Sequence, residues 1–272
     1  MSPANNRSYS AEIAEQITRT ISEGLTATLA TVIRGGTNVG AKLLVDENDN
    51  VIGSLGSGEL DQAVGQRIRA FTESRADMLV VDVSEFAPHF VDSSGMQLLL
   101  ERIQREPRLV ICGAGHVGAA LANLASLLGY QSTVIDDRNE FVTRERFPDT
   151  RIDLVAAPDW FEAVRDAVSD GRAVSVVIVT RGHSEDEVCL KAVMETGADY
   201  VGLIGSKRRT RIVLDRLREA GVSHEMLDKV HAPIGLDIGA VTPEEVALAI
   251  MAEIVAIRRR GKGGSLSTRR KG

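Results

Sequence analysis

The sequence predicts an α/β protein in which a doubly wound parallel sheet follows a smaller N-terminal α+β domain. The first observation is a set of glycines, at positions 113, 115 and 118, directly after a short apolar strand. The second is the regular alternation of strand-like and helix-like segments from residue 107 onward, which is typical of parallel sheets. Before that point, strand-like segments follow one another closely with turns between them, which favours antiparallel pairing.

The N-terminal domain is predicted over residues 1–106. Residues 1–10 are polar and expected to fray, whereas isoleucines recur at helical spacing over 11–23 and predict a helix. The Asp, Glu and Asn residues of 46–50 predict a turn between antiparallel strands, because such side chains bond their own backbone. The other predicted elements are strands over 25–33, 41–45, 51–55, 78–83 and 97–103 and a helix over 59–74.

A second domain is predicted over residues 107–258. Pro107 disfavours helix in Glu106, and the alternating pattern begins directly after it. The segment 259–272 is basic, rich in glycine and without apolar periodicity, so a disordered tail is expected there. The predicted elements are strands over 109–112, 132–135, 152–155, 174–179 and 200–204 and helices over 117–128 and 160–168.

The composition narrows the class of partner. A formal net charge of -6 argues against broad neutralisation of nucleic-acid phosphates. The apolar runs are too short to span a bilayer and the first residues lack the pattern of a signal peptide, so a cytoplasmic location is expected. Cys112 and Cys189 show no CxxC spacing and are expected to be buried, unreactive thiols. We therefore expect small-molecule or protein partners, with no nucleic acid and no membrane among them.

The glycine pattern matches the fingerprint of a Rossmann-type dinucleotide-binding domain. Gly113 is expected to make the tight turn, Gly115 to let the backbone approach a pyrophosphate, and Gly118 to let helix pack against strand. Unpaired amides at the helix start then face the phosphates. Asp136, with Asp137 beside it, ends the next strand, near the spacing expected of the acidic residue that binds the ribose. An Asp at this place favours NAD over NADP.

A polar turn follows the strand that is predicted to end at residue 179. In doubly wound sheets such turns face the ligand, so Gly182 and His183 are candidates for ligand contact. His183 is either a proton-transfer group or ligand contact, or a surface histidine of the turn. Ser184, with Glu187 three residues later, fits a helix capping box, which gives the serine a structural role.

The next strand leads through Gly205 and Ser206 into a helix with a basic start. Lys207 and Arg208 oppose the helix dipole there, so the sequence predicts a compensating charge, which an anionic ligand supplies. The alternative is that both are solvated surface charges. Farther along, Thr242 is predicted to cap a helix that follows the Gly-rich loop 231–240.

Together these motifs resemble the XdhC/CoxI family, the xanthine dehydrogenase accessory factors of molybdenum hydroxylases. The resemblance covers roughly residues 108–257 and implies a protein that holds the molybdenum cofactor, a pterin with a phosphate or nucleotide. It further implies help with the sulfuration of that cofactor or its insertion into a xanthine dehydrogenase-type or carbon monoxide dehydrogenase-type enzyme. The resemblance rests on residues 111–118, 134–138, 146–148, 180–183 with Asp186, 200–208, 231–240 and 242–245.

The resemblance implies cofactor-binding residues but no catalytic residue and no metal ligand. Its implied partners are the molybdenum hydroxylase apoenzyme and a cysteine desulfurase, and it implies a homodimer. The N-terminal domain diverges, since residues 36–38 offer no Pro or Arg and Glu59 stands where relatives have a cysteine that could contact molybdenum. The candidate cofactor-binding residues are Gly113, Gly115, His116, Gly118, Asp136, Asp137, Gly182, His183, Gly205, Ser206, Lys207 and Arg208.

Three functions are compatible with these residues. The first is a molybdenum cofactor chaperone, which is more a carrier than a catalyst. The second is an NAD-dependent oxidoreductase in which Asp136 holds the ribose and His183 moves a proton. The third is a regulator that binds a nucleotide and a partner without molybdenum. The lack of a further obvious acid or base besides His183 favours the first.

Overall fold

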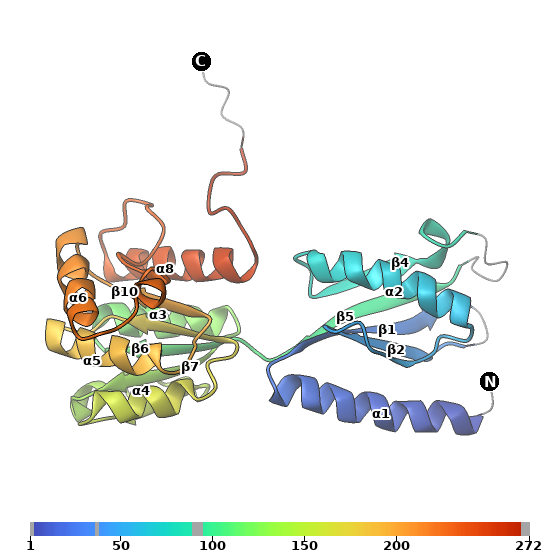
Figure 1. Cartoon of the computed structure of the whole chain (residues 1–272), viewed down its shortest axis with the longest axis horizontal. Helices are drawn as coiled ribbons and strands as arrows, with labels where there is room; N and C mark the ends of the chain where they lie inside the picture. The colour runs from blue at the N-terminus through green and yellow to red at the C-terminus, as the bar shows by residue number, and fades with distance from the viewer. Residues whose placement is uncertain (1–2, 36–37, 89–94, 268–272) are drawn as a thin grey trace, which may run out of the picture. The chain divides into compact units, whose positions relative to one another are not determined.

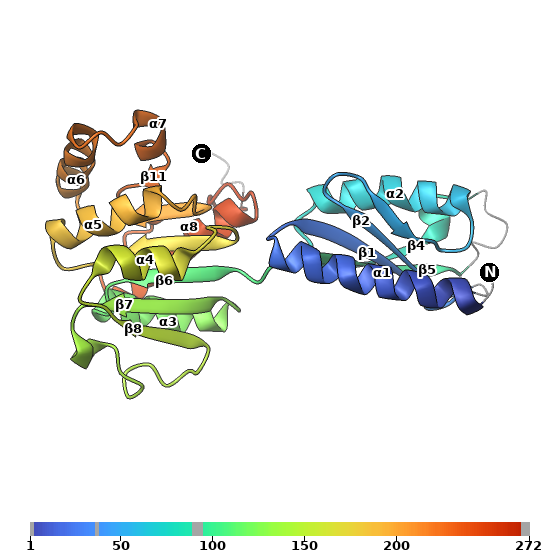
Figure 2. The same ribbon diagram turned by 60° about the horizontal axis from the view of Figure 1, so that its bottom comes forward.

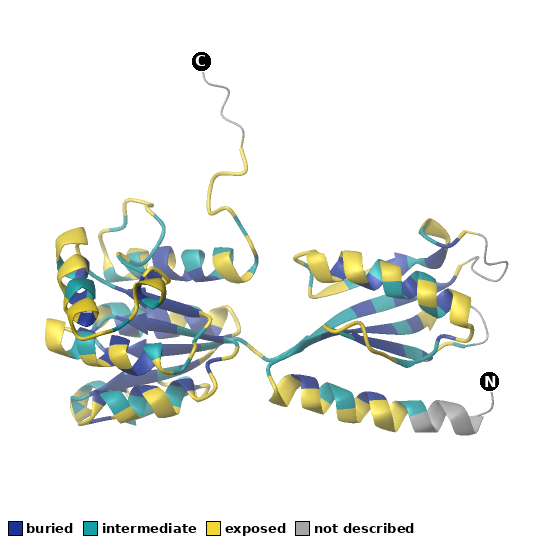
Figure 3. Ribbon diagram, viewed as in Figure 1, coloured by how far each residue is buried: buried dark blue, intermediate teal, exposed yellow. Residues whose placement is uncertain are grey.

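The chain divides into two compact units, Met1–Arg105 and Glu106–Gly272. The computed structural model describes residues 3–35, 38–88 and 95–267, with the elements labelled in Figure 1. In both units the buried residues gather on the strands and on the inner faces of the helices, as Figure 3 shows. The predicted fold class is confirmed: one unit is α+β and the other is a parallel α/β sheet.

The N-terminal unit is an antiparallel sheet with a helix on each face. Its strand order is β3-β2-β1-β5-β4. Leu29 packs with α1, whereas the next residue, Ala30, belongs to the cluster under α2, because successive strand residues point to opposite faces. The elements are α1 (Pro3–Ser22), β1 (Thr26–Arg34), β2 (Lys42–Asp46), β3 (Val51–Gly53), α2 (Gly58–Glu73), β4 (Met78–Asp82), the 3-10 turn η1 (Val83–Glu85) and β5 (Gln97–Gln104).

The elements predicted for this unit are confirmed, with one correction. Residues 3–10 do not fray but form the first turns of α1. Pro3 is the first residue of the helix, a position that suits proline because its missing N–H costs nothing there. The predicted turn at 46–50 is present, since an oxygen of Asp46 accepts from the backbone amides of Asn48 and Asn50. Residues 1–2 lie outside the described part.

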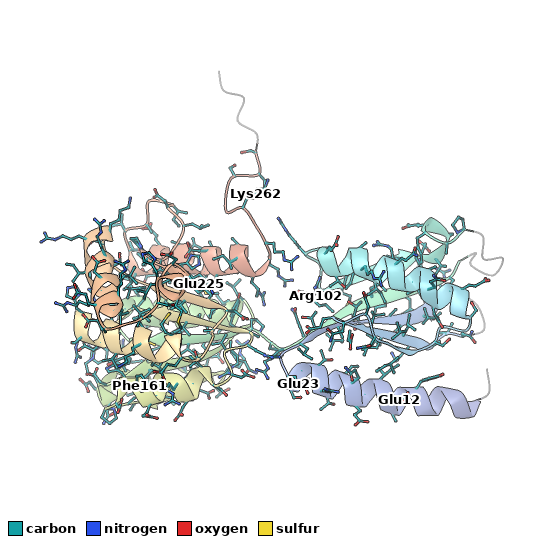
Figure 4. The ribbon with its side chains drawn as sticks, viewed as in Figure 1. Glu12, Glu23, Arg102, Phe161, Glu225 and Lys262 are labelled. Carbon is teal, nitrogen blue, oxygen red and sulfur yellow. The ribbon has the colours of Figure 1, made fainter. Side chains whose placement is uncertain are left out.

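Arg102 of β5, labelled in Figure 4, fastens the C-terminal end of α2 to the sheet. Its Nη2 atom lies 3.3, 3.2 and 3.0 Å from the carbonyl oxygens of Phe71, Thr72 and Ser74. Carbonyls at a helix end lack partners within the helix, and a cation is favoured beside them. The helix is thereby held next to the start of β4.

The C-terminal unit is a six-stranded parallel sheet in the order β11-β10-β9-β6-β7-β8. Helices cover both faces (Figure 2), with α3 and α8 packed in one apolar cluster and α4, α5 and α6 in another. The elements are β6 (Arg108–Cys112), α3 (His116–Leu127), β7 (Gln131–Asp136), η2 (Asn139–Phe141), β8 (Ile152–Ala156), α4 (Trp160–Val168), β9 (Val174–Ile178), α5 (His183–Met194), β10 (Tyr200–Leu203), α6 (Lys207–Glu219), α7 (His224–Leu227), β11 (Val230–His231) and α8 (Pro243–Arg258).

The predicted strands and helices of this unit are confirmed, and the structure adds two short elements that were not predicted, α7 and β11. Two-residue strands and one-turn helices carry too little periodicity to be recognised. Cys112 and Cys189 lie in one core cluster as buried free thiols, as expected. A hydrogen bond with Cys112, together with burial, raises the pKa of the Cys189 thiol, which disfavours the reactive thiolate.

Candidate functional site

The candidate residues gather at the carboxyl ends of four neighbouring parallel strands, β10, β9, β6 and β7. β6 pairs with β7 on one side and with β9 on the other, and β9 pairs with β10. The chain runs from β6 outward through β7 to β8 and then returns to the other side of β6 at β9, so the strand order reverses between β6 and β9. Ligands of open α/β sheets bind outside the carboxyl ends of the strands at such a point.

The glycine turn between β6 and α3 needs glycine for two different reasons. Gly113 has φ +119°, and a Cβ on it would lie 2.5 Å from the carbonyl oxygen of Val179. A Cβ on Gly118 would lie 1.9 Å from the carbonyl oxygen of Gly113, so only glycine lets α3 start this close to the strand. A Cβ on Gly115, in contrast, would meet nothing within 4 Å. The backbone at Gly115 therefore borders open space.

The start of α3 is suited to an anion. Gly115 is its N-cap and provides no side-chain cap, and no acidic residue stands in the first turn. The first amides of a helix have no partner within the helix and carry partial positive charge. His116, the first residue of α3, is exposed beside them. This end of the helix offers N–H donors to a phosphate.

Asp136, at the end of β7, is buried, and both of its carboxylate oxygens accept hydrogen bonds. One carboxylate oxygen accepts from the Ala114 amide at 2.7 Å, and the two oxygens accept from Nε and Nη2 of Arg138 at 2.8 Å each. Burial would raise the pKa of Asp136, but the hydrogen bonds from Arg138 and the Ala114 amide outweigh it and lower the pKa to about 2. The ionised carboxylate holds the glycine turn, and contact with a ribose requires Arg138 to move.

Two arginines that sequence reasoning did not assign to the site flank Asp136 and Asp137. The Arg138 guanidinium lies 3.7 Å from the ring centroid of Phe141. Arg181 Nη2 lies 2.8 Å from Oδ2 of Asp137, which joins the end of β9 to the end of β7. Because Asp137 and Arg181 are far apart in sequence, no local pattern predicts their contact. Arg138 and Arg181 therefore place positive charge beside the carboxylates of Asp136 and Asp137.

A buried polar cluster lies behind the turn after β9. Asp186 is fully buried, and its carboxylate accepts from the Thr180 hydroxyl at 2.5 Å and from Arg209 Nη2 at 2.7 Å. Burial raises the pKa of Asp186, although the hydrogen bonds from Thr180 and Arg209 act in the opposite direction. The cluster ties β9 and α5 to α6. It fixes the position of the turn that carries Gly182 and His183.

The residue that caps the start of α5 differs from the sequence prediction. The N-cap of α5 is Gly182, and the hydroxyl of Ser184 donates to its neighbour Glu185 at 3.0 Å, so the predicted capping box with Glu187 is wrong. The helix begins two residues earlier than a Ser184 cap requires. A Cβ on Gly182 would come within 2.1 Å of Glu185 Oε2. His183 is exposed in the first turn of α5.

Of the three basic residues at the start of α6, one has a structural role and the other two lie at the surface. Ser206 is the N-cap, and its hydroxyl accepts from the Arg209 amide at 3.2 Å after the left-handed turn at Gly205. Arg209 is compensated by Asp186. Lys207 and Arg208 are exposed, and both interpretations, ligand contact and solvated charge, stay open for them.

The Gly-rich loop 231–240 is fastened to α8 through Glu253. Its carboxylate accepts from the Tyr200 hydroxyl at 2.5 Å and from the Gly235 amide at 3.0 Å. The Tyr200 ring stacks on His231 with 4.7 Å between centroids. Burial and the bond to Glu253 raise the pKa of Tyr200. The predicted helix start after the loop is confirmed, since Thr242 and Glu245 form a capping box.

Within the described residues, no group of three or more His, Cys, Asp or Glu side chains is arranged to hold a metal ion. Glu59 is exposed in the first turn of α2. Over residues 3–35, 38–88 and 95–267, none of the helices has the length and hydropathy needed to cross a membrane.

Comparison with known proteins finds relatives along most of the chain. An Escherichia coli protein named uncharacterized protein YqeB is 31% identical over 228 residues, which is 82% of this chain and 41% of that protein. A Bacillus subtilis protein, named as a probable subunit of xanthine dehydrogenase, is 32% identical over 64% of this chain and 49% of its own length. The E. coli molybdenum cofactor insertion chaperone PaoD is 26% identical over 56% of this chain and 40% of its length. The chain spans less than half the length of each of these relatives.

The fold also matches a solved structure. The crystal structure of a Bacillus halodurans protein described as a xanthine dehydrogenase aligns with a TM-score of 0.64 at 21% identity, covering 92% of this chain and 67% of that one. The family model of the XdhC Rossmann domain matches residues 109–254, and that of the XdhC and CoxI family matches residues 20–82. The N-terminal domain, despite its divergent loops, thus carries the family's pattern as well. The chain belongs to the XdhC/CoxI family.

Proposed function

We propose that this protein carries the molybdenum cofactor and aids its sulfuration or its insertion into a molybdenum hydroxylase of the xanthine dehydrogenase or carbon monoxide dehydrogenase type. The observation that carries the proposal is the start of α3, where the backbone at Gly115 borders open space and the first turn has neither a side-chain cap nor an acidic residue. The names of the relatives, a cofactor insertion chaperone among them, support this choice of ligand.

The residues fit the anionic part of such a cofactor. The amides that follow Gly115 would hold its phosphate, since a helix start offers both donors and partial positive charge. Lys207 and Arg208, exposed at the start of α6, would contact a phosphate or nucleotide extension. His116 and His183, each exposed in the first turn of its helix, would donate hydrogen bonds to the ligand.

Other residues would position the site. Asp136 holds the glycine turn through the Ala114 amide, and Asp137 with Arg181 joins two strand ends. Gly182 and Gly205 shape the turns that lead into α5 and α6. When bound, the cofactor supplies the molybdenum centre that the recipient enzyme uses. We assign the protein's contacts to the phosphate and the pterin.

We place this carrier in the cytoplasm, with the apoenzyme as its main partner and a cysteine desulfurase as the source of sulfur. The role is that of a chaperone, and no residue is assigned to catalysis. The relatives' names connect the family to xanthine dehydrogenase and to cofactor insertion, which supports the choice of recipient.

The test is a titration of the purified full chain with molybdenum cofactor, compared with Gly115→Ala. Gly115 has φ -67°, which an alanine adopts freely, and its added methyl group enters only open space. The variant should therefore fold normally but bind the cofactor at least roughly tenfold more weakly, because a methyl group keeps the phosphate from the backbone. Gly65→Ala in α2, where a Cβ also meets nothing within 4 Å, is the matched control.

The cofactor titration, together with assays of NADH turnover and of recipient-enzyme maturation, separates the three candidate functions. Equal cofactor affinity in the wild type and in Gly115→Ala contradicts the proposed site. Binding of NADH with turnover of a small carbonyl compound identifies an oxidoreductase instead. Binding of a nucleotide without any effect on maturation of the recipient enzyme identifies a regulator.

A further inference from the structure

A cavity of about 260 Å³, named the α2 cavity below, lies between the N-terminal sheet and the last two turns of α2. Its inner wall includes three buried side chains, those of Thr28, Val45 and Ile68. Thr28 and Val45 are paired in register on β1 and β2, and Val45 belongs to the cluster under α2, so both side chains face this helix. All residues that line the cavity belong to the N-terminal unit, so it is separate from the proposed cofactor site.

The Thr28 hydroxyl leaves an unused acceptor in the α2 cavity. Thr72 Oγ1 donates its only proton to the carbonyl oxygen of Ile68 at 2.9 Å. The contact of 3.3 Å between the hydroxyls of Thr28 and Thr72 therefore uses the proton of Thr28. Within the described residues, no donor reaches the Thr28 oxygen, although Thr28 is only 1% exposed. Buried polar atoms usually have a partner, and a ligand with an N–H group would supply it here.

Carboxylates outnumber cations along the walls of the α2 cavity. The charged residues among its described lining are Arg69, Asp46, Glu47, Asp49 and Glu73. Arg69 is already paired, because its Nε atom lies 2.9 Å from Oδ1 of Asp49. Within the part of the chain that the structure describes, the Glu73 carboxylate has no partner. The excess of negative charge favours a positively charged ligand.

A second cavity, of about 350 Å³, also lies along α2 and shares Asp49 and Arg69 with the first. Its other carboxylate, that of Asp61, accepts from the Ser54 hydroxyl and from the Leu55 amide at 2.7 Å each. Both carboxylates that line the second cavity are therefore already bonded. The α2 cavity is the better candidate for a cationic ligand, because its acceptors include unbonded ones.

We propose that the α2 cavity binds an alkyl guanidinium, either as a free small molecule or as the arginine side chain of a polypeptide. A guanidinium has five N–H donors and no acceptor. These donors match the unused acceptors at Thr28 and Glu73 and the second oxygen of Glu47, whose first oxygen accepts from the Thr26 amide at 3.1 Å. An ammonium has only three donors at a single point. The alkyl stem packs on the apolar part of the inner wall.

The test is isothermal titration calorimetry of the purified full chain with propylguanidinium and, separately, with Nα-acetylarginine amide. Saturable binding of either one at low ionic strength supports the proposal. The tighter of the two ligands tells whether the cavity takes a free molecule or the side chain of a polypeptide. Propylurea has nearly the same shape without the charge and should bind at least about tenfold more weakly. Equal affinity for propylurea, or no saturable binding of either guanidinium, overturns the proposal.

Two variants test the proposed acceptors. Glu73→Gln removes a charge at an exposed position, and Thr28→Val removes the buried hydroxyl while nearly keeping the shape of the side chain. Each should weaken guanidinium binding about tenfold, because each removes an acceptor for a charged donor. Circular dichroism and thermal unfolding of each variant confirm that it folds.

The matched control is Glu12→Gln, which removes an exposed glutamate of α1 (Figure 4). Because α1 packs on the opposite face of the sheet, this variant should bind within about twofold of the wild type. Folded Glu73→Gln and Thr28→Val variants that bind guanidinium as the wild type does, or an equal loss in Glu12→Gln, refute the inference. The result leaves the cofactor proposal untouched, since the ligands and the units concerned are different.

Discussion

Replacing Asp136 with Asn tests the claim that this carboxylate holds the glycine turn. The pKa of Asp136 is lowered from 3.8 to about 2, and a shift of one unit corresponds to about 1.4 kcal/mol. The charged form therefore contributes roughly 2 kcal/mol to the stability of the C-terminal unit at neutral pH. Because Asp136 is 1% exposed while the Arg138 side chain is 27% exposed, the arginine can regain water in the variant. We expect Asp136→Asn to cost about 2–3 kcal/mol at pH 7.

The stability that the Asp136 carboxylate contributes falls as the pH falls. The folded pKa lies below the unfolded one, so the contribution is fully present above about pH 4 and is lost as the pH falls through about 2. Between pH 7 and pH 3 the wild type should lose about 1 kcal/mol that the variant does not lose. The difference in stability between the two proteins should narrow accordingly.

The assay is urea unfolding followed by tryptophan fluorescence. The chain has one tryptophan, and Trp160 is buried in α4, so its signal reports on the C-terminal unit alone. The control is Asp137→Asn, whose partly exposed ion pair with Arg181 should contribute less than about 1 kcal/mol. Equal midpoints for Asp136→Asn and the wild type at pH 7, or a difference that does not narrow toward pH 3, refute the reasoning.

Two further substitutions probe the supports of the site. Gly118→Ala should destabilise the C-terminal unit by about 3 kcal/mol or more, since the added Cβ would lie 1.9 Å from the Gly113 carbonyl oxygen; unchanged unfolding in the Trp160 assay contradicts this. Arg209→Met should cost about 3 kcal/mol at pH 7, because it leaves the buried Asp186 without its cation. The deficit should shrink as the pH falls toward 4, because protonation removes the unpaired charge. A deficit that does not change between pH 7 and pH 4 contradicts the reasoning, because it shows that Asp186 is already neutral at pH 7 in both proteins.

The sequence determined the features that arise from residues close together in the chain. The alternation of apolar segments fixed the strands and helices of both units, and the turn at 46–50 and the Thr242 capping box involve partners within a few residues. Gly113 and Gly118 belong to the same class, because the contact that excludes a side chain at Gly118 comes from the same turn. The local prediction was wrong at the start of α5, where both Gly182 and Ser184 are suitable N-cap residues. In the structure Gly182 is the N-cap.

Only the tertiary structure decided which charged side chains meet. For Asp136, the residue predicted to contact a ribose, the structure adds the partners that no local pattern gives, Arg138 and the Ala114 amide. The contacts of Asp186 with Arg209 and of Tyr200 with Glu253 likewise join separate strands and helices. Such partners are brought together by the order of strands in the sheet and by helix packing, which no periodicity within a single segment encodes. The place of β4 at the edge of its sheet has the same origin, because a strand becomes an edge only through the pairing of all the others.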